Sequence, residues 1–265
     1  MGALSRSPLP SALSSMVDAH SRVEHGERPQ WLSRHRLLWI APYYHERVTA
    51  DVHDAHLRAT VAAWLRAGWP VVVRRQMHGF PTHDHDARIA VGMPLCPAAN
   101  KTRVALTIAP AWIARAAPPP ALAGIIPLVS SSWRERLRRL AERATEIDVA
   151  LHVYGSLAWE ALTRTPYLTG DSDVDLLWRP TEARQLDAGV AMLAEWEAES
   201  GTRADGEILF GDDAVAWREW RRVARDGTDA RVLVKTIIGP RLARVGDLCA
   251  RLPAVEGRIA CEGVA

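Results

Sequence analysis

Two short motifs constrain the fold of this chain more than any other feature. In the first, Val153-Tyr154-Gly155-Ser156, an apolar run ends in Gly-Ser, a pair that can open a helix. The amides and the positive dipole end at a helix start bind phosphate. In the second, Asp173-Val174-Asp175-Leu176, the two carboxylates share one face of a strand, because side chains alternate along strands. Mg²⁺ prefers carboxylate and phosphate oxygens, so the two motifs together predict metal-assisted phosphoryl or nucleotidyl transfer.

A third aspartate, Asp171, lies two residues before Asp173 and would share its face if the strand began early. The apolar residues Val174 and Leu176 would point into the protein and anchor Asp173 and Asp175 at a buried sheet. We therefore assign catalysis and metal binding to Asp173 and Asp175 and place Asp171 in a loop. An acidic turn that leads into a strand is the alternative interpretation of Asp-x-Asp taken alone.

The clearest break in the chain is Ala116-Ala117-Pro118-Pro119-Pro120, because three prolines can neither enter a helix interior nor donate hydrogen bonds to a sheet. Before it, residues 1–30 mix Ser, Pro, His and Arg without periodicity, which is typical of a disordered extension. The pattern predicts a small α+β domain over 31–118 and a second domain over 119–265.

The apolar periodicity predicts an α+β fold class, with a mixed sheet flanked by helices in the second domain. In the first domain it predicts a helix over 51–68 and strands over 71–73 and 104–108. In the second domain it predicts helices over 133–147, 157–163 and 186–199. The strands expected there are 149–154, 174–178, 207–210, 214–217 and 231–238.

The charge balance argues against nucleic acid or a membrane surface as the main partner. The 33 basic and 31 acidic residues leave a formal net charge of +2, and no apolar stretch is long enough to span a membrane. Three cysteines, Cys96, Cys249 and Cys261, indicate neither a disulfide framework nor a zinc site. These features favour a cytoplasmic protein.

The Gly-Ser turn, the helix after it and the acidic strand resemble the nucleotidyltransferase superfamily of DNA polymerase beta. Within that superfamily the chain resembles the malonate decarboxylase holo-acyl-carrier-protein synthase family, also called phosphoribosyl-dephospho-CoA transferase. The resemblance covers about residues 31 to 240, and a longer Gly-Ser to Asp interval, with 165–170 inserted, departs from minimal superfamily members. It is carried by Tyr154–Trp159, Ser172–Leu177, Trp217–Glu219 and Val232–Lys235, and in the first half by Arg34-His35, Gly92–Leu95 and Lys101–Arg103.

The resemblance implies an enzyme that transfers the phosphoribosyl-dephospho-CoA group from triphosphoribosyl-dephospho-CoA to a serine of the apo acyl-carrier subunit of malonate decarboxylase, with release of pyrophosphate. It implies that Asp173 and Asp175 hold one or two Mg²⁺ ions on the triphosphate. Gly155 and Ser156 would then surround the donor phosphates. The acceptor hydroxyl could lose its proton to a carboxylate or to a metal-bound hydroxide.

The superfamily normally supplies a third carboxylate from a neighbouring strand. Asp205, Glu207 and Glu219 all qualify, and we favour Asp205 as the third metal ligand, although Asp-Gly is also typical of a turn. Lys235 lies among apolar residues of a predicted strand, where a charge is costly without a partner, and a phosphate or an acid of the site would supply that partner. We assign Lys235 to donor binding; an edge-strand lysine that faces solvent is the alternative.

Other charged segments are weaker candidates. The helix over 133–147 carries five arginines that could dock an acidic carrier protein, although a solvated helix face is the simpler interpretation. His83-Asp84-His85-Asp86 contains potential metal ligands but is expected to be a loop. A phosphate pocket could be built from basic side chains of the first domain, namely Arg34, Arg36, Arg74, Arg75, Lys101 and Arg103.

Two other functions compete with the carrier-protein transferase. One is a nucleotidyltransferase that adds a nucleoside monophosphate to a small molecule or another protein. The other is a binding module that keeps the fold without catalysis. The intact pair Asp173 and Asp175 argues against the second, because a lost site need not keep two carboxylates directed at one metal.

Overall fold

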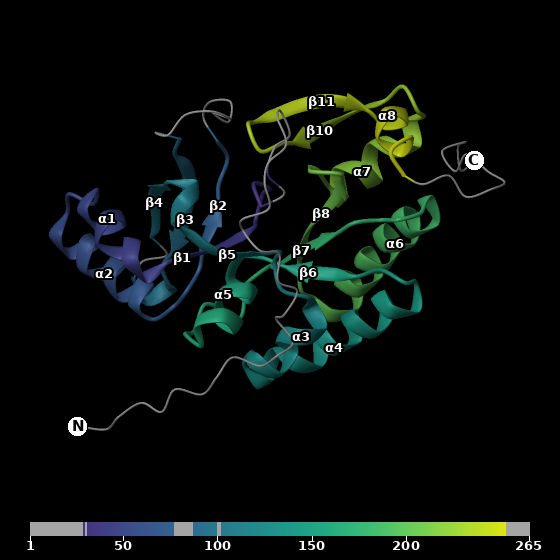
Figure 1. The fold of residues 1–265 in the computed structure, drawn as a ribbon. Helices are drawn as coiled ribbons and strands as arrows, with labels where there is room; N and C mark the ends of the chain where they lie inside the picture. Colours follow the sequence, from purple (N-terminus) through teal and green to yellow (C-terminus); the bar gives the residue numbers. More distant parts are fainter. Residues whose placement is uncertain (1–28, 30, 77–86, 100–101, 253–265) are drawn as a thin grey trace.

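The computed structural model describes residues 29, 31–76, 87–99 and 102–252. Two β-sheets lie beside each other, the first formed before residue 118 and the second after it (Figure 1). The predicted extension over 1–30, apart from Pro29 itself, and the loop His83–Asp86 lie outside the described residues.

The first sheet has five antiparallel strands in the order β4-β3-β2-β1-β5, and two helices pack beside it. Its core forms because alternate residues of a strand such as β4 are buried and exposed. The strands are β1 (Leu37–Ile40), β2 (Val71–Val73), β3 (Ile89–Pro94), β4 (Arg103–Ile108) and β5 (Ile113–Ala117), and the helices are α1 (His45–Ala50) and α2 (Ala55–Arg66).

The predicted helix over 51–68 is too long at its start. The side chain of Asp54 accepts a hydrogen bond from the Leu57 amide at 2.7 Å, and Asp54 itself has an extended backbone. An aspartate in this position caps a helix, so α2 begins at Ala55.

The second sheet has six strands in the order β11-β10-β9-β8-β7-β6, and only the β7–β8 pair is parallel. The strands are β6 (Leu151–Val153), β7 (Val174–Trp178), β8 (Ala204–Phe210), β9 (Asp213–Ala216), β10 (Arg231–Lys235) and β11 (Pro240–Arg244). The helices are α3 (Leu122–Ile125), α4 (Ser131–Glu146), α5 (Gly155–Thr163), α6 (Ala183–Ser200), α7 (Trp217–Val223) and α8 (Val245–Cys249). The mixed sheet and its helices confirm the predicted α+β fold class.

The two faces of the second sheet differ in chemistry. One face packs under helices: a Cβ added at Gly206 would lie 3.1 Å from a methyl group of Leu193 on α6. The opposite face carries Asp175, Asp205 and Glu207, since these residues alternate with the buried apolar ones along β7 and β8. The acidic residues of the sheet therefore lie on the face away from α6.

The proline segment runs as extended chain between the two sheets. The Val153 amide donates a hydrogen bond to the Pro120 carbonyl at 2.9 Å, and Ala121 forms a bridge with His152. Trp159, Tyr167 and Ile237 of the second half pack into the core of the first. The division into 31–118 and 119–265 remains a prediction, because the two halves share this packing.

Two further sequence expectations concern membrane spanning and cysteine chemistry. Among the described residues, no helix has both the length and the apolar character needed to cross a membrane. Cys96 is a free thiol, whereas Cys249 is disulfide-bonded, which departs from the expectation that the cysteines form no disulfide.

Candidate active site

The predicted carboxylates meet where β7 and β8 run in parallel. Asp175 and Asp205 are direct neighbours in the register of the two strands, and Glu207 follows one step further on the same face. Asp173 immediately precedes β7 and is 41% exposed, 3.7 Å from the guanidinium of Arg203. The parallel pairing thus places Asp205 beside Asp175, although the two residues are 30 positions apart in the sequence.

The Gly-Ser turn presses against the same carboxylates. Gly155 begins α5 with a φ of +60°, a backbone conformation that favours glycine. A Cβ at this position would lie 1.8 Å from Oδ2 of Asp175, and the Tyr154 amide donates to the Asp175 carbonyl at 3.1 Å. Glycine is therefore required here by its contact with Asp175, whereas the sequence suggested only close approach to phosphate. Ser156 follows in the first turn of α5 and lines the adjoining cavity.

Asp175 lies in an electrostatic environment that opposes its negative charge. Burial, then the charges of Asp205 and Asp173, raise its pKa from 3.8 to about 7, although Arg103 acts in the opposite direction. Within the described part of the chain, no Lys, Arg or His side chain forms an ion pair with Asp175 or Asp205. This pair of strands therefore presents negative charge without a bonded cation.

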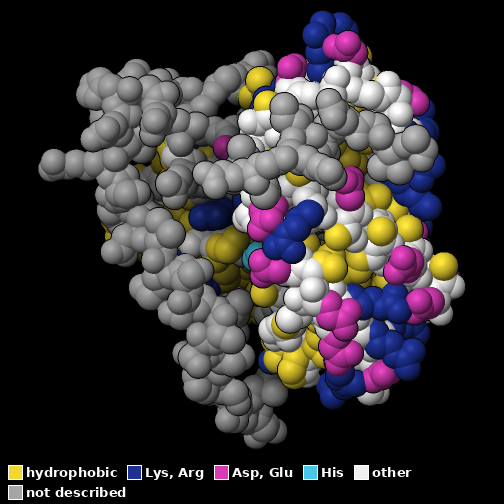
Figure 2. Space-filling view, turned by 90° about the vertical axis from the view of Figure 1, so that its right-hand side faces the viewer, with side chains coloured by type: hydrophobic (Ala, Val, Ile, Leu, Met, Phe, Trp, Pro, Cys, Tyr) yellow, Lys and Arg dark blue, Asp and Glu magenta, His cyan; other side chains and the backbone are white. Residues whose placement is uncertain are grey.

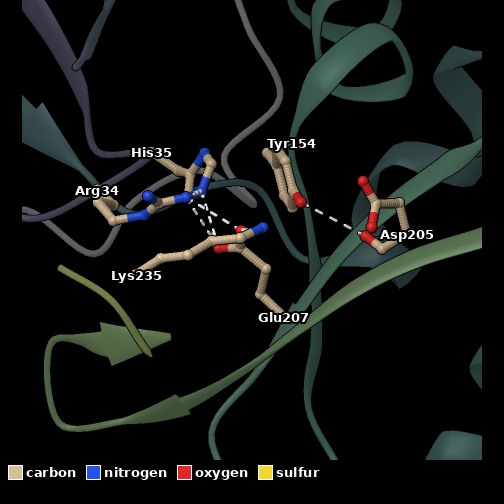
Figure 3. Close-up of polar contacts among 6 residues, drawn as sticks. All are labelled: Arg34, His35, Tyr154, Asp205, Glu207 and Lys235. Atoms are coloured by element: carbon tan, nitrogen blue, oxygen red, sulfur yellow. Dashed lines mark hydrogen bonds and ion pairs between the residues drawn. The ribbon is translucent and has the colours of Figure 1, made fainter. Parts of the chain in front are cut away.

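Glu207 has the opposite environment (Figure 3). Its carboxylate is 1% exposed and accepts hydrogen bonds from Arg34 Nη2 at 3.0 Å and from Lys235 Nζ at 2.7 Å, while His35 Nε2 lies 3.2 Å away. Burial would raise the pKa of Glu207, but the His35 hydrogen bond, the charges of His35 and Arg34, and the Lys235 hydrogen bond outweigh it and lower the pKa to about 2. The Glu207 carboxylate is thus engaged by three basic side chains and acts as an ion-pair partner.

The cluster around Glu207 joins the two halves of the chain. Arg34 and His35 precede β1 of the first sheet, whereas Glu207 and Lys235 belong to β8 and β10 of the second. The His35 ring packs against Tyr154 with a centroid distance of 4.0 Å, and the Tyr154 hydroxyl donates to the Asp205 carbonyl at 3.4 Å (Figure 3). The cluster therefore fixes the first sheet next to the carboxylate strands.

A cavity of about 480 Å³ opens between the two halves beside this cluster. One wall carries Asp175 and the α5 start, and the other carries basic side chains of the first sheet. Arg74 lies across Gly92 of β3, where an added Cβ would be 2.9 Å from Arg74 Cδ. The lining residues with charge or phosphate-binding potential are Arg34, His35, Arg74, Arg75, Arg103, Gly155, Ser156 and Asp175.

The structure separates the remaining candidates. Glu219 accepts a hydrogen bond from the Leu233 amide at 2.7 Å and is occupied in holding α7 to β10. Arg36 does not line the cavity, and Lys101 lies outside the described residues. Lys235 bonds to Glu207, the acid partner that the sequence allowed as an alternative to phosphate. Arg74, Arg75 and Arg103 do line it, as the basic-pocket hypothesis requires.

Sequence reasoning missed the contribution of His35 and Tyr154. Their rings contact each other at a tilted angle across the junction between the halves, and only the Arg34-His35 dipeptide of the family resemblance points to one of them. Tyr154 belongs to the Gly-Ser motif, yet nothing in the local sequence indicates that its hydroxyl reaches β8.

Helix α4 lies away from this site. Trp196 of α6 donates to the Arg136 carbonyl of α4 at 3.0 Å, so α4 stacks on the helix that covers the face of the sheet opposite the carboxylates. Its arginines are also paired: Arg138 and Arg139 bond to Glu135, and Arg143 bonds to Glu199. Figure 2, which shows the right-hand side of Figure 1, has basic and acidic side chains intermixed over its lower part. The structure thus places the arginine-rich helix far from an acceptor that enters at Asp175.

The carboxylates of the site have the charge that a divalent cation requires, but they do not form a complete set of metal ligands. No group of three His, Cys, Asp or Glu side chains gathered tightly enough to hold a metal occurs among the described residues. Asp175 and Asp205 nevertheless supply adjacent carboxylates that form no ion pair with a described Lys, Arg or His side chain, and Asp173 lies just before the start of β7. Such an open, oxygen-only arrangement is typical of Mg²⁺ sites that take part of their ligands from substrate phosphates.

A Gly-Ser helix start beside paired carboxylates on adjacent strands defines a nucleotidyltransferase-type transferase. The chain belongs to the phosphoribosyl-dephospho-CoA transferase family. Residues 33–119 match the family described as "Phosphoribosyl-dephospho-CoA transferase MdcG N-terminal domain", and residues 121–245 match "Phosphoribosyl-dephospho-CoA transferase MdcG C-terminal domain". The resemblance stated from the motifs is thereby confirmed, and the protein is an enzyme of the transferase class.

Proteins named phosphoribosyl-dephospho-CoA transferase are similar over most of the chain. One from Xanthomonas campestris pv. campestris (strain 8004) is 36% identical over 222 residues, which cover 82% of this chain and 98% of the relative. One from Bradyrhizobium diazoefficiens is 34% identical, covering 82% of this chain and 91% of the relative. One from Pseudomonas aeruginosa is 32% identical, covering 68% and 87%. No solved structure matches the chain.

Proposed function

We propose that this enzyme transfers the phosphoribosyl-dephospho-CoA group from triphosphoribosyl-dephospho-CoA to a serine of the acyl-carrier subunit of malonate decarboxylase, and releases pyrophosphate. The observation that carries the proposal is the cavity between the two halves, with carboxylates on one wall and arginines on the other. Family membership supports the reaction class. A cytoplasmic location remains part of the proposal.

The donor has an anionic triphosphate and a nucleotide arm, and the cavity offers complementary groups for both. Arg103 faces the Asp175 side of the cavity, close enough to influence the Asp175 pKa, and Arg74 and Arg75 lie beside it. Guanidinium groups bind phosphate oxygens in a bidentate manner, which orients as well as attracts the donor. The amides at the start of α5 supply further phosphate ligands next to Ser156.

Asp173, Asp175 and Asp205 are the residues that would hold Mg²⁺. When bound, the ion would neutralise charge on the triphosphate and on the departing pyrophosphate. Arg103 would bind the donor phosphates on the side of the cavity that faces Asp175, and Gly155 keeps the α5 start in contact with Asp175. Lys235, Arg34 and His35 act indirectly, because they neutralise Glu207 and hold the two walls together.

The acceptor reaction needs one bond made and one broken at the same phosphorus. The serine hydroxyl oxygen attacks the phosphorus that bears the ribosyl oxygen, and the bond from this phosphorus to the pyrophosphate oxygen breaks. The hydroxyl proton leaves with a carboxylate oxygen of the site as its acceptor. Positioning both reactants in one cavity, together with stabilisation of the developing charge, supplies most of the catalytic advantage in such transfers.

The test uses purified enzyme, the triphosphate donor and apo acyl-carrier subunit. We expect pyrophosphate release that requires Mg²⁺ and is abolished by EDTA, together with a carrier mass increased by one phosphoribosyl-dephospho-CoA group. Asp175→Asn and Asp173→Asn should each remove turnover, while circular dichroism stays unchanged. A carrier of unchanged mass, or near-normal turnover in either variant, would contradict the proposal. A mass gain of one nucleoside monophosphate from a nucleoside triphosphate would favour the alternative nucleotidyltransferase reaction instead.

A further inference from the structure

The face that carries the catalytic carboxylates continues beyond the cavity onto the β10–β11 hairpin. Lys235 of β10 pairs with Ala214 of β9, and Ala214 pairs with Leu209, which lies on the carboxylate face of β8. Because alternate residues of a strand share a face, Leu233 and Arg231 of β10 lie on the same face as Lys235. Their partners on β11 are Leu242 and Arg244. We call Arg231, Leu233, Leu242 and Arg244 the hairpin patch.

The hairpin patch combines exposed apolar and basic groups. Leu242 is 60% exposed and Leu233 is 39% exposed, and Ile238 at the hairpin tip is 63% exposed. Few other large hydrophobic side chains of the described residues are as exposed. The stretch from residue 231 to 244 contains four Lys or Arg residues and no Asp or Glu, and three of the four form ion pairs with acids elsewhere in the second half: Lys235 with Glu207, Arg241 with Asp213, and Arg244 with Asp229. An apolar centre between arginines is the usual composition of a protein-docking surface.

The hairpin patch lies within the reach of one interface centred on the active site. Neighbouring strands are about 4.8 Å apart, so β10 is about 10 Å and β11 about 15 Å from β8, which carries Asp205. A standard interface buries about 800 Å² on each partner, which corresponds to a disc of about 16 Å radius. Such a disc centred on Asp205 covers both strands of the hairpin. Centred on Asp175 of β7, which is one strand further away, it covers β10 and ends about 3 Å short of β11.

Among the described residues of the first half, none forms a hydrogen bond or ion pair with the four residues of the hairpin patch. A contact between the first half and the hairpin lies at the tip end, where the Gln76 amide donates to the Ile237 carbonyl at 2.7 Å. Figure 1 shows β10 and β11 at the opposite end of the second half from α4. On the hairpin side of the cavity, the sheet face that carries the carboxylates thus extends to the protein surface.

We propose that the hairpin patch docks the carrier protein during transfer. The occupant is an acidic carrier protein that places apolar side chains on Leu233 and Leu242 and carboxylates on Arg231 and Arg244. The inference rests on the proposed function, and it replaces the arginine-rich helix α4 as the docking surface. Charge at the rim of such an interface mainly raises the association rate and is weakened by salt.

The experiment compares Leu242→Glu and the double variant Arg231→Glu with Arg244→Glu against a matched control. The control is Arg138→Glu with Arg139→Glu on α4, which makes the same change of charge on the opposite face. We measure initial rates against apo carrier at saturating donor, and the affinity of each enzyme for a carrier whose acceptor serine is alanine. Far-ultraviolet circular dichroism and thermal unfolding check the fold.

We expect the KM for carrier to rise about tenfold or more in both hairpin variants, with kcat and donor affinity unchanged, and the defect of the arginine variant to shrink in high salt. The α4 control should behave as wild type. Unchanged carrier KM and affinity in both hairpin variants would overturn the inference while leaving the transferase function intact. If wild type binds the carrier through the patch but releases no pyrophosphate, the docking surface stands and the proposed function fails. A wild-type dimer that Leu242→Glu disrupts would show that a second copy covers the patch, and would also overturn the inference.

Discussion

Replacing the central carboxylate should destroy activity and at the same time stabilise the metal-free protein. Asp175 has a pKa raised from 3.8 to about 7 by burial and by its neighbours Asp205 and Asp173. The folded state therefore binds the Asp175 proton more tightly than the unfolded state does. As pH rises from about 4 to about 7, the unfolded chain releases this proton first, and the folded state loses stability. An uncharged amide has no such proton to release, so Asp175→Asn avoids this loss.

The size of the effect follows from the pKa difference. A shift from 3.8 to about 7 corresponds to about 4 kcal/mol at pH 8. Because Asp175 keeps partial contact with water, we expect Asp175→Asn to raise the free energy of unfolding by about 2 to 4 kcal/mol at pH 8 in EDTA. The difference should become small near pH 4, where the folded carboxyl is protonated and the unfolded carboxyl is about half protonated.

Urea unfolding followed by circular dichroism at pH 4, 6 and 8 measures the effect. Asp173→Asn is the matched control: Asp173 is 41% exposed and has Arg203 nearby, so its substitution should raise the free energy of unfolding much less than Asp175→Asn, because it removes only one of the charges that act on Asp175. Added Mg²⁺ should stabilise wild type but not Asp175→Asn, because a ligand that binds only the folded state adds to its stability. Equal stability of wild type and Asp175→Asn at pH 8 without metal would refute the electrostatic account of this site.

Three further predictions concern the groups around this carboxylate. Glu207→Gln should lower the free energy of unfolding by about 3 kcal/mol at pH 7, and chemical unfolding should show the loss fading between about pH 4.5 and 2, because the low pKa of Glu207 stabilises the fold only above that window. Gly155→Ala should abolish turnover and lower the melting temperature in calorimetry, since its methyl group would overlap the Asp175 carboxylate and the positive φ disfavours alanine. Arg103→Ala should weaken donor binding in isothermal titration by about tenfold without changing the fold, whereas an unchanged dissociation constant would remove Arg103 from the donor site.

The parts of the site that a short stretch of sequence encodes were predictable. The Gly-Ser motif forms the start of α5, and the strand predicted over 174–178 is β7 with the same bounds. Both depend on local rules, namely the need for glycine at a positive φ and the alternation of polar and apolar residues in a strand. The favoured Asp205 is also where the parallel pairing puts a carboxylate beside Asp175.

What the sequence could not provide are partners that lie far apart along the chain. Nothing near Glu207 indicates that Arg34, His35 and Lys235 surround it, so its role as an ion-pair centre emerges only from the fold. The strands β3 and β11 were missed, because Gly92 and Pro94 in one and Pro240 with two arginines in the other obscure the alternation. The position of α4 on the far face likewise depends on how the sheet is covered.

The ion-pair cluster has a consequence for how the protein is made. Arg34 is 173 residues and His35 is 172 residues ahead of Glu207 in the chain, so ribosomes deliver the two basic groups long before their acid partner. At a synthesis rate of about 5 to 20 residues per second, that interval lasts about 10 to 35 seconds. During this time the nascent first half must keep both side chains hydrated, and it becomes locked to the second half only after β8 and β10 have left the ribosome.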